Sequence, residues 1–336
     1  DDVESRGLGD VYKRQILFIP FAKRIRREMP EGITLSGYMG DKYKSDGVKK
    51  VYLFQLMGLS ILSTGVQLLA GSQVLSTATG LPFTLVTVLL AVIALSYSLF
   101  SGIKASMLTD AIQMVFMLAV SAAFLIMAIK EGGITAMTNG MNGISGNYTS
   151  FFSKEGIEVF LSFGLPTTVG LLSGPFGDQC FWQRAFAVKK NRIGHAFLLG
   201  AILFGIVPLS MGILGFVGAG IGYQAKDLGV INFELILAMF PVWVVLPFLY
   251  MIISGLLSTV DSNLCAASSL VTDMSGGKAL KKTKWAMVVL LVIGILIAHI
   301  TELTVTNLFL FYGTLRYSTF LPTILTIKVV KLTPRG

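Results

Sequence analysis

The sequence predicts an all-α protein that crosses a membrane several times. Of its 336 residues, 54% are hydrophobic and only 13% are charged, whereas soluble globular proteins carry about 25% charged residues. The stretch 51–103 contains no charged residue and is long enough for two membrane helices. Lysines and arginines gather in alternate connecting segments. This composition excludes a soluble enzyme, a disordered chain and a fibrous protein.

The first 15 residues are expected to be foreign to the fold. They show no hydrophobic periodicity and meet an apolar run abruptly at Ile16, and residues 7–15 resemble translated adapter sequence at the end of a gene model. A short native polar tail is the alternative interpretation. We therefore expect one transmembrane domain in 16–336, incomplete because its native N-terminal part lies upstream.

Apolar runs predict about eight full membrane helices and one partial helix in this domain. A helix that spans a bilayer needs about 20 mostly apolar residues, whereas the strands of a membrane barrel would give shorter, alternating runs. Residues 76–82 have the composition of a turn and divide the first long run into two helices. In order, the expected segments are 16–22 as the partial helix, 51–103 as two helices, and 105–129, 159–177, 196–217, 242–272, 285–301 and 306–327 as one helix each.

The distribution of basic residues predicts the orientation in the membrane. If alternate connecting segments face one side, starting with 23–50, that side collects 20 lysines and arginines and the other only Lys130, Lys154 and Lys226. Loops rich in Lys and Arg stay in the cytoplasm, so we expect a multi-pass protein of the inner or plasma membrane. The basic residues spread over five segments, which argues against a nucleic-acid partner. The segment 130–158, on the opposite side, is expected to be a surface loop.

The run 242–272 carries polar residues at spacings of three and four, which places them on one helical face. The adjacent hydroxyls of Ser258 and Thr259 suit a hard monovalent cation such as sodium, because hard ions prefer oxygen ligands. Two alternatives remain: the hydroxyls bond back to carbonyl groups one turn earlier, or the small side chains permit close helix packing. The polar face consists of Ser254, Ser258, Asp261, Ser262, Cys265, Ser268, Ser269 and Thr272.

Asp110, Asp261 and Arg316 lie inside expected membrane helices, where charged side chains are costly and therefore candidate functional groups. Asp110 either lines an inward path or occupies a helix N-terminus, where the helix dipole favours a carboxylate. Arg316 either grips the carboxylate of a bound molecule or forms a structural ion pair with Asp261 or with helix carbonyls. Prolines and glycines around Pro166 and Pro175 predict a broken helix, a feature of midplane binding sites, although proline kinks occur in membrane helices of all kinds.

Three motifs resemble the sodium:solute symporter family, and the resemblance extends over 16–336. The chain departs from the family pattern where Ser101 replaces a glycine, and where Gly37 and Lys42 replace an acidic residue and an arginine. The motifs are Tyr97, Ser101-Gly102 and Ala105 followed by Thr109-Asp110-Ala111-Ile112-Gln113; Asp178-Gln179-Cys180-Phe181-Trp182-Gln183-Arg184-Ala185, similar to the family's Gln-Arg loop after a broken helix; and Leu257-Ser258-Thr259-Val260-Asp261-Ser262 with Ser268-Ser269 and Asp273.

The resemblance implies a five-plus-five inverted-repeat helix bundle that works by alternating access. It implies sodium as the coupling ion, bound by Ser258, Thr259 and the carbonyl of Gly255, and no organic cofactor. The remaining sodium ligands in the family come from the first core helix, which we expect ahead of Ile16. The partners are then a sodium ion, a small-molecule solute and the lipid bilayer.

The resemblance also bears on the solute. Sugar-transporting members carry an Asn and an aromatic gate before the Gln-Arg loop, and residues 169–176 contain neither Asn nor Tyr. We therefore expect a sodium-coupled symporter that imports a small organic solute other than a sugar, with Arg316 favouring a carboxylate-bearing or amino-acid-like molecule. Further candidates for the substrate or ion pathway are Ser173, Gly174, Asp110 and Asp261.

A membrane sensor module of the same fold, fused to a histidine kinase, is the alternative function. An enzyme is disfavoured, because the sequence has no cluster of His, Cys or paired carboxylates suited to chemistry at the inner face.

Overall fold

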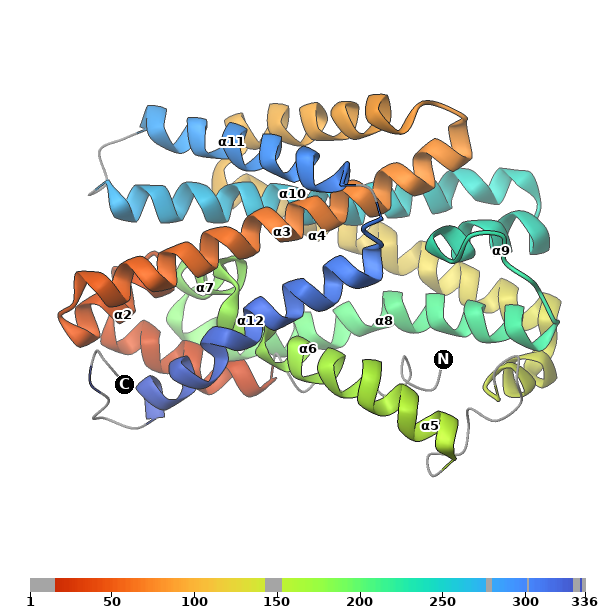
Figure 1. Ribbon diagram of the computed structural model, residues 1–336, viewed down its shortest axis with the longest axis horizontal. Helices are drawn as coiled ribbons and strands as arrows, with labels where there is room; N and C mark the ends of the chain where they lie inside the picture. The colour runs from red at the N-terminus through yellow and green to blue at the C-terminus, as the bar shows by residue number, and fades with distance from the viewer. Residues whose placement is uncertain (1–15, 143–152, 276–279, 301, 329–332, 334–336) are drawn as a thin grey trace.

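The computed structural model describes residues 16–142, 153–275, 280–300, 302–328 and 333. Within these residues the secondary structure is helical, and Figure 1 shows long helices running side by side along the molecule. The helices are an N-terminal helix over 16–28, α2 (Leu35–Tyr43), α3 (Asp46–Thr79), α4 (Phe83–Gly140), α5 (Lys154–Val159), α6 (Leu165–Gly177), α7 (Gln179–Ala187), α8 (Ile193–Gly220), α9 (Ile231–Met239), α10 (Val245–Met274), α11 (Leu280–Ala298) and α12 (Val305–Lys328).

Five helical segments in the described part of the chain are long and apolar enough to cross a membrane. A shorter apolar helix covers Phe83–Leu99, and α11 and α12 pack against α3 and α6 in the same bundle. Within the described residues, each run expected from the sequence is mainly helical, which confirms the all-α membrane fold. The five segments are Asp46–Thr79, Gly102–Gly140, Lys154–Gly177, Lys190–Gly220 and Val242–Met274.

The turn expected at 76–82 is confirmed. Helix α3 ends at Thr79, and Gly80 follows with φ +71°, a left-handed conformation that glycine adopts without steric cost. Pro82 then immediately precedes α4 and has no backbone N–H to leave unpaired. Farther along, Gly102 has φ +61° and ψ 174° and interrupts α4, so that its two parts correspond to two expected membrane helices.

The segment 130–158, expected to be a surface loop, is helical at both ends. Helix α4 continues to Gly140 after a second interruption at Gly133, and α5 begins at Lys154. The polar composition suggested a loop, but Ala136 is buried where α4 packs against α8. Packing between the two helices thus overrides local composition here.

An aromatic cluster fixes α7 at one end of the bundle. The ring of Phe18 on the N-terminal helix lies 4.6 Å from that of Trp182 on α7 and 5.5 Å from that of Phe176 on α6. Trp182 also donates its indole N–H to the carbonyl of Phe176 at 2.9 Å. Asp178, between the two helices, accepts a hydrogen bond from the N–H of Cys180 and caps α7.

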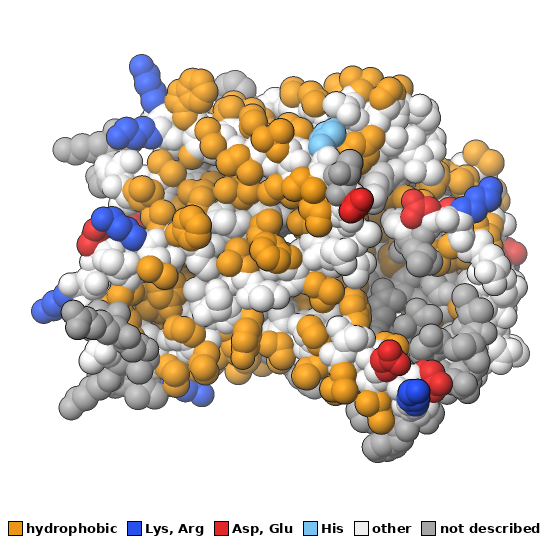
Figure 2. Space-filling view, in the orientation of Figure 1, with side chains coloured by type: hydrophobic (Ala, Val, Ile, Leu, Met, Phe, Trp, Pro, Cys, Tyr) orange, Lys and Arg blue, Asp and Glu red, His pale blue; other side chains and the backbone are white. Residues whose placement is uncertain are grey.

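Charged and apolar side chains occupy different zones of the surface. Figure 2 shows hydrophobic side chains over the middle of the visible face and Lys and Arg side chains mainly at the end that carries α2 and the start of α11. This separation agrees with a molecule whose middle lies in lipid.

We predict that Gly220→Ala destabilises the protein, because a Cβ at this position would lie 1.8 Å from the carbonyl oxygen of Ala136 on α4. Forcing these backbones apart should lower the free energy of unfolding by about 1–3 kcal/mol. The matched control is Gly215→Ala on the same helix, where a Cβ meets no atom within 4 Å. Thermal unfolding in detergent measures both, and an equal effect of the two changes would contradict the close helix contact.

We also predict an acid-sensitive contact between the N-terminal helix and α2. Burial raises the pKa of Glu28, but hydrogen bonds from Tyr38, Lys42 and Arg24 outweigh it and lower that pKa from 4.5 to about 2. A lowered pKa means that the carboxylate stabilises the fold above pH 4.5 and that this contribution is lost as the pH falls towards 2.

Glu28→Gln should therefore flatten the loss of stability between pH 4.5 and 2, measured as unfolding temperature against pH. The control is Glu31→Gln, because the exposed side chain of Glu31 makes no hydrogen bond within the described part of the chain. A pH profile that Glu28→Gln leaves unchanged would refute the assignment.

Candidate functional site

Helix α7 lays a polar face against α10. Gln179, Cys180, Gln183 and Arg184 are spaced so that they share one side of the helix. Gln183 donates to the carbonyl of Ser262 at 3.2 Å, and Cys180 contacts the amide oxygen of Asn263 at 3.4 Å. Gln179 donates both to Ser269 on α10 and to the carbonyl of Ile33 before α2. The residues from Asp178 to Ala185, expected as a loop, are thus an N-cap and a helix whose polar side chains have partners.

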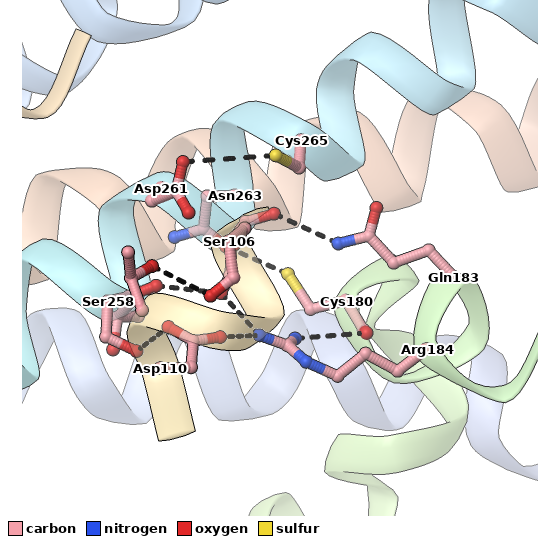
Figure 3. Close-up of polar contacts among 12 residues, drawn as sticks. Ser106, Asp110, Cys180, Gln183, Arg184, Ser258, Asp261, Asn263 and Cys265 are labelled. Atoms are coloured by element: carbon pink, nitrogen blue, oxygen red, sulfur yellow. Dashed lines mark hydrogen bonds and ion pairs between the residues drawn. The ribbon is translucent and has the colours of Figure 1, made fainter. Parts of the chain in front are cut away.

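Arg184 joins three elements at the centre of this contact (Figure 3). One guanidinium nitrogen lies 2.7 Å from a carboxylate oxygen of Asp110 on α4 and 2.7 Å from the hydroxyl of Ser262 on α10. Another donates to the carbonyl of Cys180 at 3.3 Å. Within the hydrophobic bundle, the positive charge of Arg184 and the negative charge of Asp110 therefore compensate each other.

Asp110 connects this ion pair to the expected sodium ligands. Its second carboxylate oxygen accepts a hydrogen bond of 2.5 Å from the hydroxyl of Ser258. Asp110 lies eight residues beyond Gly102, where α4 is interrupted, and the helix dipole acts mainly within the first turn. The helix N-terminus therefore does not stabilise the carboxylate of Asp110. Its side-chain partners on α7 and α10 stabilise it instead.

The three expected sodium ligands lie next to one another on α10. The hydroxyl of Thr259 donates to the carbonyl of Gly255 at 3.0 Å, and Ser262 donates to the carbonyl of Ser258 at 2.7 Å. These are the local hydrogen bonds that the alternative interpretation anticipated. They do not exclude an ion, because a hydroxyl that donates one hydrogen bond retains two acceptor lone pairs. The hydroxyl, carbonyl and carboxylate oxygens here are the ligand types that a hard cation prefers.

Asp261 faces a different neighbour from Ser258. It is fully buried, and one of its carboxylate oxygens accepts a hydrogen bond of 2.6 Å from Ser98 in the first part of α4. The thiol of Cys265 lies 3.9 Å from the same oxygen. Asp261 thus belongs to the packed contact between α10 and α4.

Arg316 pairs with Asp178, which corrects the expectation that it pairs with Asp261 or with helix carbonyls. The two side chains form an ion pair of 3.0 Å, and the guanidinium lies 3.7 Å from the ring centre of Tyr312. The reason is the close crossing of α6 and α12, where a Cβ on Gly170 would lie only 3.2 Å from the Cα of Gly313. This crossing brings Arg316 to the junction of α6 and α7.

Ser173 and Gly174 are buried in α6. Ser173 donates to the carbonyl of Gly170 at 2.9 Å, and the helix runs through Pro175 to Gly177. The expected break is therefore displaced: a π-helical turn at Phe160–Gly164 precedes α6, and the chain leaves helical geometry at Asp178. Such π-turns are often found near functional sites.

Asp178 and Arg184 were not expected to be site residues, although both belong to the motif at 178–185. Asp178 and Arg184 form the ion pairs at the start and in the middle of α7. Their signal was the spacing of polar residues in 178–185, which fits one face of a helix better than a loop.

We predict that Arg184→Gln lowers the free energy of unfolding by about 1–3 kcal/mol, because it leaves Asp110 without its charged partner. Adding Asp110→Asn should recover part of this loss, since the double variant buries no unpaired charge. The control is Lys50→Gln, which removes an ion pair with Asp46 whose side chains are 76% and 73% exposed and should change stability by at most about 0.5 kcal/mol. Strictly additive losses in the double variant would contradict a direct Asp110–Arg184 interaction.

Several known transporters are similar in sequence to this chain. The sodium/pantothenate symporter of Haemophilus influenzae is 26% identical over 232 residues, 66% of this chain and 47% of that protein. Probable urea active transporter 2 of Schizosaccharomyces pombe is 25% identical over 206 residues, 58% of this chain and 30% of that protein. The osmoregulated proline transporter OpuE of Bacillus subtilis is 22% identical over 275 residues, 78% of this chain and 54% of that protein. The chain thus spans about a third to a half of the length of these relatives.

A solved structure shares the fold. A sodium-coupled sialic acid symporter in a substrate-bound outward-open state superposes with a TM-score of 0.74 at 14% sequence identity, covering 94% of this chain and 82% of that one. The model of the sodium:solute symporter family matches residues 7–333. The match therefore begins within 1–15, the segment that is expected to be foreign to the fold. This segment lies outside the described residues, so the expectation stays a prediction. This chain belongs to the sodium:solute symporter family.

Proposed function

We propose that the protein is a sodium-coupled symporter that imports a small organic solute by alternating access. The family makes it a multi-pass membrane transporter and not an enzyme. The proposal of sodium coupling is supported by a group of oxygen atoms on α10, from Ser258, Thr259 and Gly255. The hydroxyl of Ser258 contacts the carboxylate of Asp110 on α4.

These oxygens would hold the coupling ion. A sodium ion in a low-dielectric interior needs several oxygen ligands to replace its water, and the hydroxyls of Ser258 and Thr259 retain lone pairs for it. Asp110 adds a negative charge beside them, but Arg184 already neutralises that charge. Sodium and Arg184 therefore compete for the same carboxylate, so that ion binding would be linked to the contact between α7 and α4.

We assign the end of the molecule rich in Lys and Arg to the cytoplasm, because positively charged loops are retained on that side. Helix α7 and Arg184 then lie between the ion site and the cytoplasm. An ion leaving inward would pass α7 after Arg184 has released Asp110.

The solute would bind where α6 and α12 cross. Curated relatives are named for urea, pantothenate and proline, and the structural neighbour for sialic acid. These names support a small polar solute without selecting one, and the absence of Asn and Tyr in 169–176 continues to argue against a sugar.

A proton is the second candidate for the coupling ion. One relative, 24% identical over 242 residues, is the urea-proton symporter DUR3 of Oryza sativa subsp. japonica. Asp110 supplies a carboxylate that can bind a proton, in contact with Ser258. Uptake driven by a pH gradient in the absence of sodium would favour this candidate.

The test is uptake of radiolabelled urea, pantothenate and proline into proteoliposomes, with an imposed sodium or pH gradient. We expect sodium-driven uptake, and Ser258→Ala with Thr259→Ala should raise the sodium concentration for half-maximal uptake about tenfold or more, because two ion ligands are lost.

The matched control is Thr138→Ala with Ser162→Ala, which removes two exposed hydroxyls that also donate to their own helix carbonyls. It should leave the sodium dependence unchanged. Wild-type sodium dependence in the Ser258/Thr259 variant would refute the ion site.

A further inference from the structure

A pocket opens between α6 and α12, beside the close approach of Gly170 and Gly313. Its volume is about 10 Å³, roughly the smallest cavity that holds one water molecule. Typical pockets for drug-sized ligands are larger, about 300–1,000 Å³. The pocket therefore has room for a single small group, such as one oxygen atom of a larger molecule.

Arg316 is the charged residue in the pocket wall, and its charge is already compensated. Its side chain is 9% exposed and that of Asp178 is 6% exposed, and the two form an ion pair of 3.0 Å. Tyr312, also in the wall, stacks under the guanidinium. The guanidinium of Arg316 lines the pocket, but together with Asp178 it carries no net charge.

Two polar atoms of pocket residues have no partner among the residues that the structure describes. They are the Nε of Arg316 and the hydroxyl oxygen of Thr167, both buried. A buried donor without an acceptor is unfavourable. Arg316 has only donors, and the hydroxyl of Thr167 can donate as well. The pocket is therefore complementary to an oxygen that accepts hydrogen bonds.

The charge balance decides which kind of oxygen fits. A carboxylate would add a negative charge to a wall that is already neutral, and an uncompensated charge in a buried site is strongly disfavoured. A carbonyl oxygen of a neutral group accepts the same hydrogen bonds without adding charge. Asp178 therefore reverses the preference for a carboxylate that Arg316 alone suggests.

We infer that this pocket is a solute subsite that takes the carbonyl oxygen of a neutral amide or urea-type group rather than a carboxylate. The inference rests on the proposed function, in which the solute binds where α6 and α12 cross. It names Arg316 and Thr167 as the donors and Asp178 as the residue that sets the selectivity through Arg316.

Acetamide and acetate test the inference, because they share one heavy-atom skeleton and differ in charge. In proteoliposomes at pH 7.5, the sodium-dependent part of uptake is the difference between sodium and potassium buffers, which removes passive permeation. Labelled urea, acetamide and acetate are compared. We expect sodium-dependent uptake of urea or acetamide that exceeds that of acetate.

Asp178→Asn provides the decisive variant. The amide oxygen can still accept the N–H of Cys180 and cap α7, but the charge that neutralises Arg316 is removed. The ratio of acetamide to acetate uptake should fall about tenfold. The matched control is Asp227→Asn, another capping aspartate that accepts the N–H of Gly229 in an exposed turn; its ratio should stay that of the wild type.

Thr167→Val and Thr167→Ser give an independent readout that leaves the ion pair intact. Thr167→Val removes the hydroxyl and should raise the KM for the neutral solute several-fold. Thr167→Ser keeps a hydroxyl and should restore the KM of the wild type. Preferential uptake of acetate by the wild type, or an unchanged ratio in a folded Asp178→Asn protein, would overturn the inference while sodium-driven transport stands. Absence of sodium-dependent uptake for every solute, pantothenate and proline included, would overturn the proposed function as well.

Discussion

The guanidinium of Arg184 lies between the carboxylate of Asp110 and the hydroxyl of Ser262, and the polar interior is arranged around this contact. A carboxylate between apolar helices is tolerated only with a partner, and α7 supplies that partner from one side of α10. The helix can do so because its start is capped by Asp178 and its apolar side is held by the aromatic cluster around Trp182. Packing at the end of the bundle thus positions the charged partner of Asp110 beside the proposed ion site.

The same short helix also contacts the second ion pair. Asp178, at its start, neutralises Arg316 beside the pocket between α6 and α12, and Arg184 neutralises Asp110 beside the oxygens of Ser258. Both proposed binding regions therefore lie beside α7, one next to its N-cap Asp178 and the other next to Arg184. A symporter must make the binding of ion and solute interdependent, and a helix that contributes to both regions is a physical means of linking them.

Much of the fold follows from local features of the sequence. The long apolar runs, the turn before Pro82 and the polar face of α10 depend on residues close together in the chain, and all three are present. The partners of the charged residues depend instead on how distant helices cross. Arg316 and Asp178 are 138 residues apart, and Arg184 and Asp110 are 74 apart. The sequence indicated that these charges need partners, but the crossing of α6 and α12 determines which partners they find. The helical end at 130–140 was missed because the packing of α4 against α8, rather than composition, orders it.

Direct binding of labelled sodium to the purified protein tests the central claim, that Ser258 and Thr259 beside Asp110 form the ion site. Binding of ²²Na⁺ to the wild type should be saturable and displaced by unlabelled sodium but not by potassium. It should weaken about tenfold or more in Ser258→Ala with Thr259→Ala and stay unchanged in Thr138→Ala with Ser162→Ala. Wild-type affinity for ²²Na⁺ in the Ser258/Thr259 variant would contradict the account.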